Sequence, residues 1–109
     1  MAHSAIQQPI FAKRLAQARE RAGLSQRQLG MLAGMDPQVA SPRINQYEKG
    51  KHEPQLETAK RLAKVLGIPP AFLYTEDDQL AKLLLLWSEM SPAERKKLLN
   101  RAEADHKAG

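Results

Sequence analysis

The strongest constraint on the fold is a series of short helical patterns, each closed by a glycine. From Phe11 to Ala22 the apolar residues recur at steps of four, three and four, as they do on one face of a helix. Gly23 stands where helices commonly end, because glycine accepts the left-handed backbone of that position. Three further helical patterns end in the same way, at Gly34, Gly50 and Gly67. No alternating pattern typical of a strand interrupts them, so the sequence predicts an all-α protein.

Two proline dipeptides precede Gly50, Asp-Pro at 36–37 and Ser-Pro at 41–42. Each has the form of a helix start, because proline suits the first helical turn but breaks a helix interior. We therefore expect a short turn at 37–40 and a separate helix over 42–48. Ile44 and Tyr47, three residues apart, are its predicted inward pair.

The rest of the chain divides at Thr75. A fourth helix is expected over 55–66, and a short fifth helix begins at the double proline 69–70. Beyond Thr75 an acidic helix start and then a capping box at 91–94 predict two more helices. The predicted organisation is a frayed segment at 1–9, a five-helix domain at 10–74 and a helical tail at 75–109.

The charge of the chain is unevenly distributed. Residues 1–74 hold 11 basic and 5 acidic side chains, a net charge of +6, whereas residues 75–109 hold 6 basic and 7 acidic, a net charge of −1. A positive excess confined to the five-helix part favours a polyanionic partner for that part.

Several function classes find no support in the sequence. The chain has no cysteine, so disulfide frameworks, cysteine-ligated zinc and thiol catalysis are excluded. Its longest apolar run, at 83–87, is far shorter than the roughly 20 residues that span a membrane, and no signal peptide is visible. The three histidines are scattered and no catalytic motif is present. We expect a cytoplasmic, nucleoid-associated protein that is not an enzyme and needs no cofactor or metal.

A longer motif runs through the basic part of the chain. Its first section is Arg19-x3-Gly-Leu-Ser-Gln26-x2-Leu-x3-Ala-Gly34, its second is Ile44-x2-Tyr-Glu-x-Gly-Lys-x2-Pro54, and its third is Leu62-Ala-x2-Leu-Gly-Ile68. Over about residues 10–74 the sequence resembles the phage-repressor and Cro type of helix-turn-helix domain, found in the xenobiotic-response-element family of transcriptional regulators. The resemblance implies a five-helix, lambda-repressor-like domain, here with a C-terminal two-helix appendage. It also implies sequence-specific binding of double-stranded DNA, usually by a dimer on a two-fold operator.

The spacing departs from this family in one place. In members of the family the glycine that corresponds to Gly50 commonly follows the one that corresponds to Gly34 by about twelve positions, whereas in this chain it follows by sixteen positions. We expect the four extra residues to lengthen the turn between the second and third helices, at about 35–38.

The predicted third helix is the expected reader of DNA. A major groove about 12 Å wide admits one helix, and base edges are read well by Asn, Gln and Arg side chains. With Ile44 and Tyr47 buried, the residues left facing outward are Ser41, Arg43, Asn45 and Gln46, which we predict to contact bases. The positions that the family uses for base contacts fall on Ser41, Pro42, Asn45 and Gln46. A plain solvated helix face is the alternative interpretation.

Phosphate contacts are predicted around these base-contacting residues, which are called the predicted readers below. Gln26 begins the second helix, and the resemblance gives this position a phosphate contact. The flanking candidates are Arg27, Lys49 and Lys51, with Arg43 as a further one and Arg14 as a weaker one. The resemblance pairs Arg19 with Glu48 as a structural ion pair, which keeps both off the binding surface.

The tail carries an apolar stripe formed by Leu80, Leu83, Leu84 and Trp87. It can fold back onto the five-helix domain or pair with a second copy. We favour a homodimer, which would place two recognition helices about 34 Å apart. Two alternatives from other classes stay open: a protein-interaction module of the same fold, antitoxin-like or co-activator-like, and an effector-sensing tail.

Overall fold

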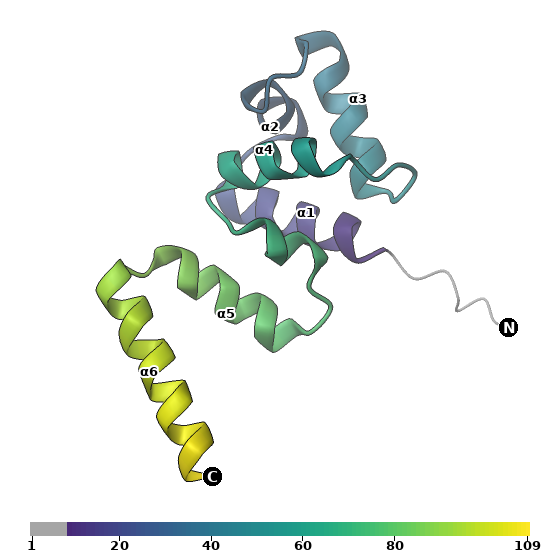
Figure 1. Ribbon diagram of the computed structural model, residues 1–109. Coiled ribbons are helices and arrows are strands. Elements are labelled where there is room, and N and C mark those ends of the chain that lie inside the picture. The colour runs from purple at the N-terminus through teal and green to yellow at the C-terminus, as the bar shows by residue number, and fades with distance from the viewer. Residues whose placement is uncertain (1–8) are drawn as a thin grey trace, which may run out of the picture.

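The computed structural model describes residues 9–109, and every regular element in that range is a helix (Figure 1). The elements are α1 (Ile10–Ala22), α2 (Gln26–Leu32), α3 (Pro37–Glu48), α4 (Leu56–Leu66), the 3-10 helix η2 (Pro70–Tyr74), α5 (Asp78–Glu89) and α6 (Pro92–Ala108). This arrangement confirms the all-α class predicted from the sequence. The predicted frayed segment, apart from Pro9, lies outside the described residues.

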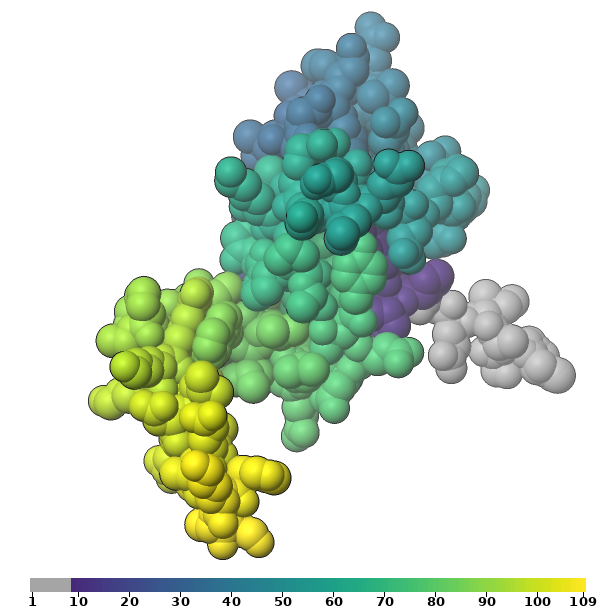
Figure 2. All heavy atoms as spheres, viewed as in Figure 1, coloured from purple at the N-terminus to yellow at the C-terminus, as the bar shows by residue number. Residues whose placement is uncertain are grey.

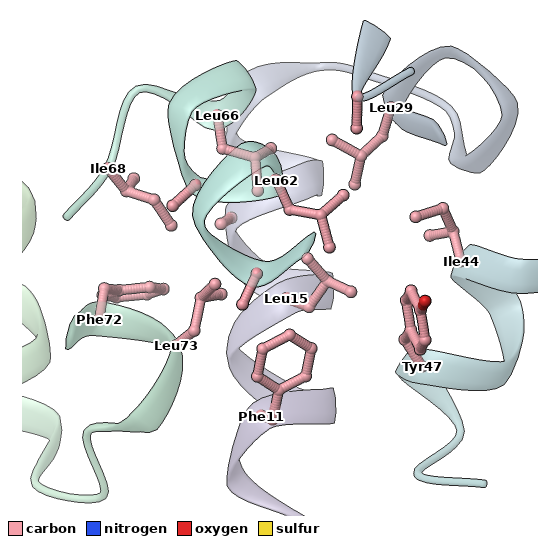
Figure 3. Close-up of a cluster of buried hydrophobic side chains, with 14 of the residues drawn as sticks. Phe11, Leu15, Leu29, Ile44, Tyr47, Leu62, Leu66, Ile68, Phe72 and Leu73 are labelled. Atoms are coloured by element: carbon pink, nitrogen blue, oxygen red, sulfur yellow. The ribbon is translucent and has the colours of Figure 1, made fainter. Parts of the chain in front are cut away.

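The core lies where α1, α3, α4 and η2 converge on the face of α1 that the sequence predicts (Figure 3). Its largest fully buried side chains are Leu15, Leu29, Ile44, Leu62 and Leu73. Burying a leucine or isoleucine of this kind contributes about 1.5 to 3 kcal/mol each. The small aliphatic core therefore fixes α3 through its inner face and leaves the outer face available.

Helix α3 differs from the sequence prediction. It is one continuous helix of 12 residues, not a turn at 37–40 followed by a helix from Pro42, so this expectation was wrong. The Asp36 carboxylate caps the helix by accepting the N–H of Gln38 at 2.9 Å, and Pro37 occupies the first turn. Pro42 lies inside the helix on an exposed position, where water can solvate the backbone carbonyl that loses its donor.

The expected lengthening of the turn before α3 is also wrong. The turn occupies only residues 33–36, and the residues that follow it are helical. Buried Ala40, Ile44 and Tyr47 continue one helical face at steps of four and three. Their burial holds the additional turn of helix in place despite the interior proline.

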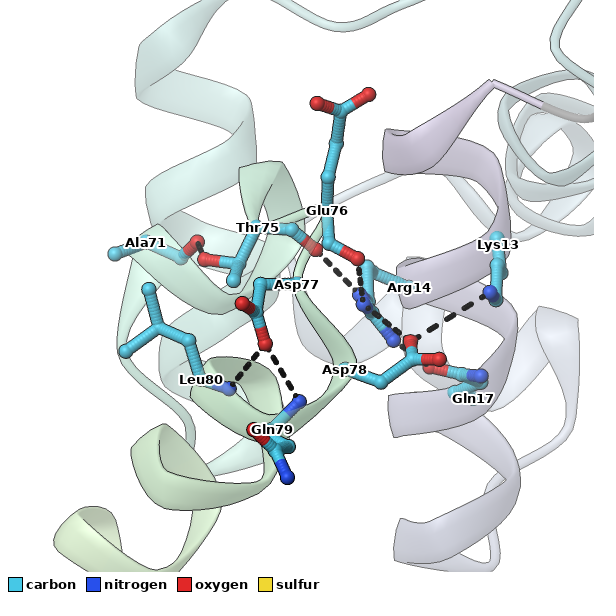
Figure 4. Close-up of polar contacts among 10 residues, drawn as sticks. All are labelled: Lys13, Arg14, Gln17, Ala71, Thr75, Glu76, Asp77, Asp78, Gln79 and Leu80. Atoms are coloured by element: carbon cyan, nitrogen blue, oxygen red, sulfur yellow. Dashed lines mark hydrogen bonds and ion pairs between the residues drawn. The ribbon is translucent and has the colours of Figure 1, made fainter.

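The beginning of the tail is tied to α1 by Arg14 (Figure 4). Its side chain is 3% exposed and donates from Nε to the carbonyl of Thr75 at 2.7 Å. Its Nη2 donates to the carbonyl of Glu76 at 3.0 Å and to Oδ1 of Asp78 at 2.9 Å. Helix α5 then runs along the domain, with Ala81 buried, whereas α6 leads away from it and buries no residue (Figures 1 and 2).

Candidate nucleic-acid interface

A close crossing of α2 and α3 sets the geometry of the site. Gly30 lies against Ala40, and a Cβ atom added to Gly30 would lie 2.7 Å from Cβ of Ala40 and 2.9 Å from its Cα. Only glycine permits this approach, because the nearest Ala40 atoms include backbone that cannot move aside. The two helices are thereby held as one unit, with α3 on the outside.

A polar network joins α1, α2 and α3 beside this crossing. Glu48 accepts from Arg19 twice, from Nε at 2.6 Å and from Nη2 at 3.0 Å. Gln26 Nε2 adds a bond of 3.1 Å to Glu48 and one of 3.2 Å to Oδ1 of Asn45. The network therefore connects the predicted ion pair to one of the predicted readers.

The Arg19–Glu48 pair lies mostly away from water, with side-chain exposures of 16% and 9%. The hydrogen bonds that Arg19 donates to the Glu48 carboxylate raise the pKa of Arg19 above its ordinary value. Arg19 also donates to the carbonyl of Leu24 at 3.0 Å. These contacts hold the end of α3 against the turn between α1 and α2.

The predicted base-contacting residues do not share one side of α3. Asn45 faces the start of α2, as its bond to Gln26 shows, and Ser41 lies one helical turn before it on the same flank. Arg43 is two residues from Asn45, roughly 200° around the helix, and so points to the opposite flank. Gln46 lies about 100° from Asn45 and is exposed. Ser41, Asn45 and Gln46 can face one groove together, and Arg43 is better placed for the backbone at its edge.

The predicted phosphate contacts divide into two groups. Arg27, Lys49 and Lys51 are exposed around α2 and the end of α3. Gln26 is half-buried and its amide group donates within the protein. Arg14 is not available to a phosphate at all, because it is buried among the carbonyls at the start of the tail. The weaker Arg14 prediction was therefore wrong.

Sequence reasoning missed two features of this site. The role of Gly30 was not assigned, although a glycine inside a helical pattern often marks a close approach of two helices. The bond between Gln26 and Asn45 joins residues 19 positions apart, and no local pattern announces it. Both follow from how α2 and α3 cross.

The predicted dimerisation stripe is divided between two environments. Leu84 and the neighbouring Leu85 pack against the core, whereas Leu80, Leu83 and Leu86 are 47%, 41% and 47% exposed. Trp87 is half-buried beneath Arg95, whose guanidinium carbon lies 5.2 Å from the ring centroid. Arg95 also donates to the carbonyl of Trp87 at 3.0 Å, which fixes the corner between α5 and α6.

Comparison with known proteins identifies the kind of domain. The sequence profile of the family described as helix-turn-helix matches residues 15–73, more than half of the chain. The chain belongs to the Cro/C1-type helix-turn-helix family. The matched segment contains the α2–α3 crossing, the Arg19–Glu48 pair and the predicted readers. In this family α2 and α3 are the two helices of the motif, and α3 is the recognition helix.

Two relatives agree with this assignment. The crystal structure described as transcriptional regulator BswR superposes with a TM-score of 0.81 at 48% sequence identity, covering 85% of this chain and 92% of that chain. An uncharacterized HTH-type transcriptional regulator of Haemophilus influenzae is 44% identical over 55 residues. That match covers 50% of this chain, and the chain spans about half of the length of that relative, 52%. The chain thus belongs to a helix-turn-helix family in which both of these relatives are described as transcriptional regulators.

Two further observations concern membrane-spanning helices and metal sites. Across residues 9–109 no helix is both long and apolar enough to cross a membrane. Within the same residues no group of three histidine, aspartate or glutamate side chains is arranged to hold a metal ion.

Proposed function

We propose that this helix-turn-helix protein is a repressor that binds a two-fold DNA operator as a dimer. The observation that carries the proposal is the outer surface of α3, where Gln46 is exposed and Asn45 contacts Gln26 at the start of α2, with Ser41 one helical turn before Asn45. Neutral amides there can read base edges, and an Asn or Gln side chain pairs with adenine through two hydrogen bonds. Occupying a promoter through such contacts excludes the transcription machinery. We expect the protein to work in the cytoplasm, without catalytic activity.

The exposed cations supply the part of the affinity that does not depend on sequence. Arg27, Arg43, Lys49 and Lys51 surround the readers and suit phosphate contacts. Each phosphate neutralised on a duplex lowers the slope of log K against log salt by about 0.9. We expect Gln26 to reach a phosphate only if one of its internal bonds opens.

DNA binding is tested by using the full chain to select duplexes from a random pool. The affinity for the selected duplexes is then measured at several salt concentrations. One enriched sequence with two-fold symmetry and a steep salt dependence is the expected result. Equal, weak affinity for all duplexes would contradict specific recognition. Stoichiometric capture of a protein partner without any duplex affinity would favour a protein-interaction module instead.

The proposed dimer uses the outward face of α5. Leu80, Leu83 and Leu86 are exposed there, and a second copy can cover them by two-fold pairing of the same face. Point variants suit the test better than removal of the tail, because truncation at Thr75 would leave buried Arg14 without Asp78.

Analytical ultracentrifugation of the full chain tests this interface. We expect Leu83→Lys to be monomeric at concentrations where the wild type is a dimer. Leu56→Lys is the matched control, because Leu56 is a 59% exposed leucine at the start of α4 and outside the tail. A monomeric wild type, or a Leu83→Lys protein that stays dimeric, would rule out this face.

A further inference from the structure

We propose that Gln38, in the first turn of α3, is a specificity-determining residue that reads an adenine, with Pro42 contacting the methyl group of a neighbouring thymine. This inference rests on the proposed function and assigns base contacts to a segment that the sequence predicted to be a turn. It adds a base contact about one helical turn before Ser41, closer to the start of α3.

The first step is the position of the additional helical turn. The turn between α2 and α3 contains only residues 33–36, so Gln38 lies in the first turn of α3, which begins at Pro37. Gly30 and Ala40 fix the crossing near the beginning of α3. In Figures 1 and 2 this beginning stands at the apex of the molecule, away from α4 and the tail. Residues of the first turn are therefore placed to enter a groove first, as the N-terminal residues of recognition helices do.

The second step is the direction in which Gln38 points. The buried face of α3 is centred on Ala40, Ile44 and Tyr47. At 100° per residue, Gln38 and Pro42 both lie roughly opposite the middle of that face, one turn apart. Both residues are exposed. Asn45 lies beyond them toward the C-terminal end, so the outer face presents an amide, an apolar ring and a second amide in sequence.

The third step is the chemistry of these groups. A glutamine amide donates to N7 of adenine and accepts from its N6 amino group, and an apolar side chain packs against the thymine methyl group. Proline offers no hydrogen bond from its side chain, but its ring suits a methyl contact. Gln38 and Asn45 are about 10 Å apart along the helix axis, which corresponds to at most about three base pairs of 3.4 Å. The two amides therefore read different base pairs of one half-site.

The experiment repeats the random-duplex selection with the full-length Gln38→Ala and Gln46→Ala variants. Alanine keeps the backbone N–H that Asp36 accepts, so the helix cap survives the change. Gln79→Ala is the matched control, because Gln79 is an exposed glutamine in α5, outside the recognition helix. Circular dichroism melting of each variant checks the fold.

We expect Gln38→Ala to lose the preference at one A·T pair of each half-site, with roughly 5- to 150-fold less discrimination there. The base pairs lost with Gln46→Ala should be different, and Gln79→Ala should select the wild-type sequence. Pro42→Ala should weaken a preference for thymine beside the same pair, and alanine cannot harm the helix because it is the better helix former.

Three results would overturn the inference. An unchanged selected sequence with Gln38→Ala would remove Gln38 from the readers and leave the proposed function intact. An equal loss of affinity for every duplex would make Gln38 a backbone contact instead. A wild-type protein that enriches no sequence would end both this inference and the proposed function.

Discussion

Nε2 of Gln26 lies 3.2 Å from Oδ1 of Asn45, and this bond joins the first residue of α2 to the outer surface of α3. Because Oδ1 of Asn45 accepts from Gln26, the side-chain nitrogen Nδ2 of Asn45 points away from Gln26 and can donate to a base. The oxygen keeps a second lone pair, so a two-bond contact with adenine remains available. The bond would thereby orient Asn45, a proposed base contact, before DNA arrives, which lowers the entropic cost of binding.

The first prediction concerns this orientation. In Gln26→Ala, Asn45 loses a bond whose net contribution is about 1 kcal/mol, so discrimination at the base pair that Asn45 is proposed to read should fall by up to about fivefold. The measurement is the ratio of affinities for the selected duplex and for one changed at that pair. Arg27→Ala is the control, which should weaken both duplexes equally and reduce the salt slope by about 1. A ratio that stays constant in Gln26→Ala would show that the bond does not orient Asn45.

The second prediction concerns the pair formed by Arg19 and Glu48. Arg19→Met alone or Glu48→Leu alone leaves a mostly buried charge without its main partner, which should lower the free energy of unfolding by about 3 kcal/mol. The double variant should lose less than the sum of the two, because neither charge is then left unpaired. Urea unfolding of the four proteins followed by circular dichroism measures the coupling. Additive losses would show that the two residues act independently.

How far the sequence could predict this fold is best judged at α3. Ala40, Ile44 and Tyr47 carry the helical face that the structure buries, so the signal for one helix was present. The rule that proline breaks a helix interior nevertheless led to the prediction of a turn and a separate helix. The interior proline costs about 3 kcal/mol in isolation, but burial of Ile44 and Tyr47, with the Asp36 cap, offsets that cost. Local rules fail where tertiary contacts of this size oppose them.

The tail and the site show a second limit. The periodicity of Leu80, Leu83, Leu84 and Trp87 correctly indicated a helix, but it could not show that Leu84 would pack against the core. The ion pair of Arg19 and Glu48 followed from the family motif and is present. The burial of Arg14 depends on carbonyls more than 60 positions away, and no pattern around Arg14 indicates it.

The third prediction tests the close crossing of α2 and α3. Gly30→Ala gains helix propensity worth about 1 kcal/mol but places a methyl group 2.9 Å from the Ala40 backbone. Overpacking of this kind costs about 1 to 3 kcal/mol, so we expect a net loss of stability together with a rotated α3 and weaker specific binding.

Ala40→Gly in the same protein should restore only part of the specific binding, because it removes the Cβ atom at 2.7 Å but leaves the Cα atom at 2.9 Å. The readouts are thermal melting and affinity for the selected duplex. Gly109→Ala, at the end of α6, is the control for a glycine change elsewhere in the chain. Wild-type specificity in Gly30→Ala would mean that this crossing does not position the recognition helix.

The last prediction is a pH dependence at the connection between α1 and the tail. The hydrogen bond from Arg14, with the nearby charge of Lys13, lowers the pKa of Asp78 below its ordinary value of 3.8. A carboxyl group with a depressed pKa in the folded state stabilises the fold above the unfolded value, and this contribution disappears as the pH falls through the folded value. Asp78→Asn should therefore have a lower free energy of unfolding than the wild type near neutral pH. This difference in unfolding free energy should stay constant down to about pH 4 and shrink below it, as urea unfolding at a series of pH values would show.

Asp105→Asn, in an exposed pair with Arg101 on α6, is the control and should show a much smaller difference from the wild type. A difference between wild type and Asp78→Asn that persists unchanged at pH 2 would show that Asp78 acts through its shape and not through its charge.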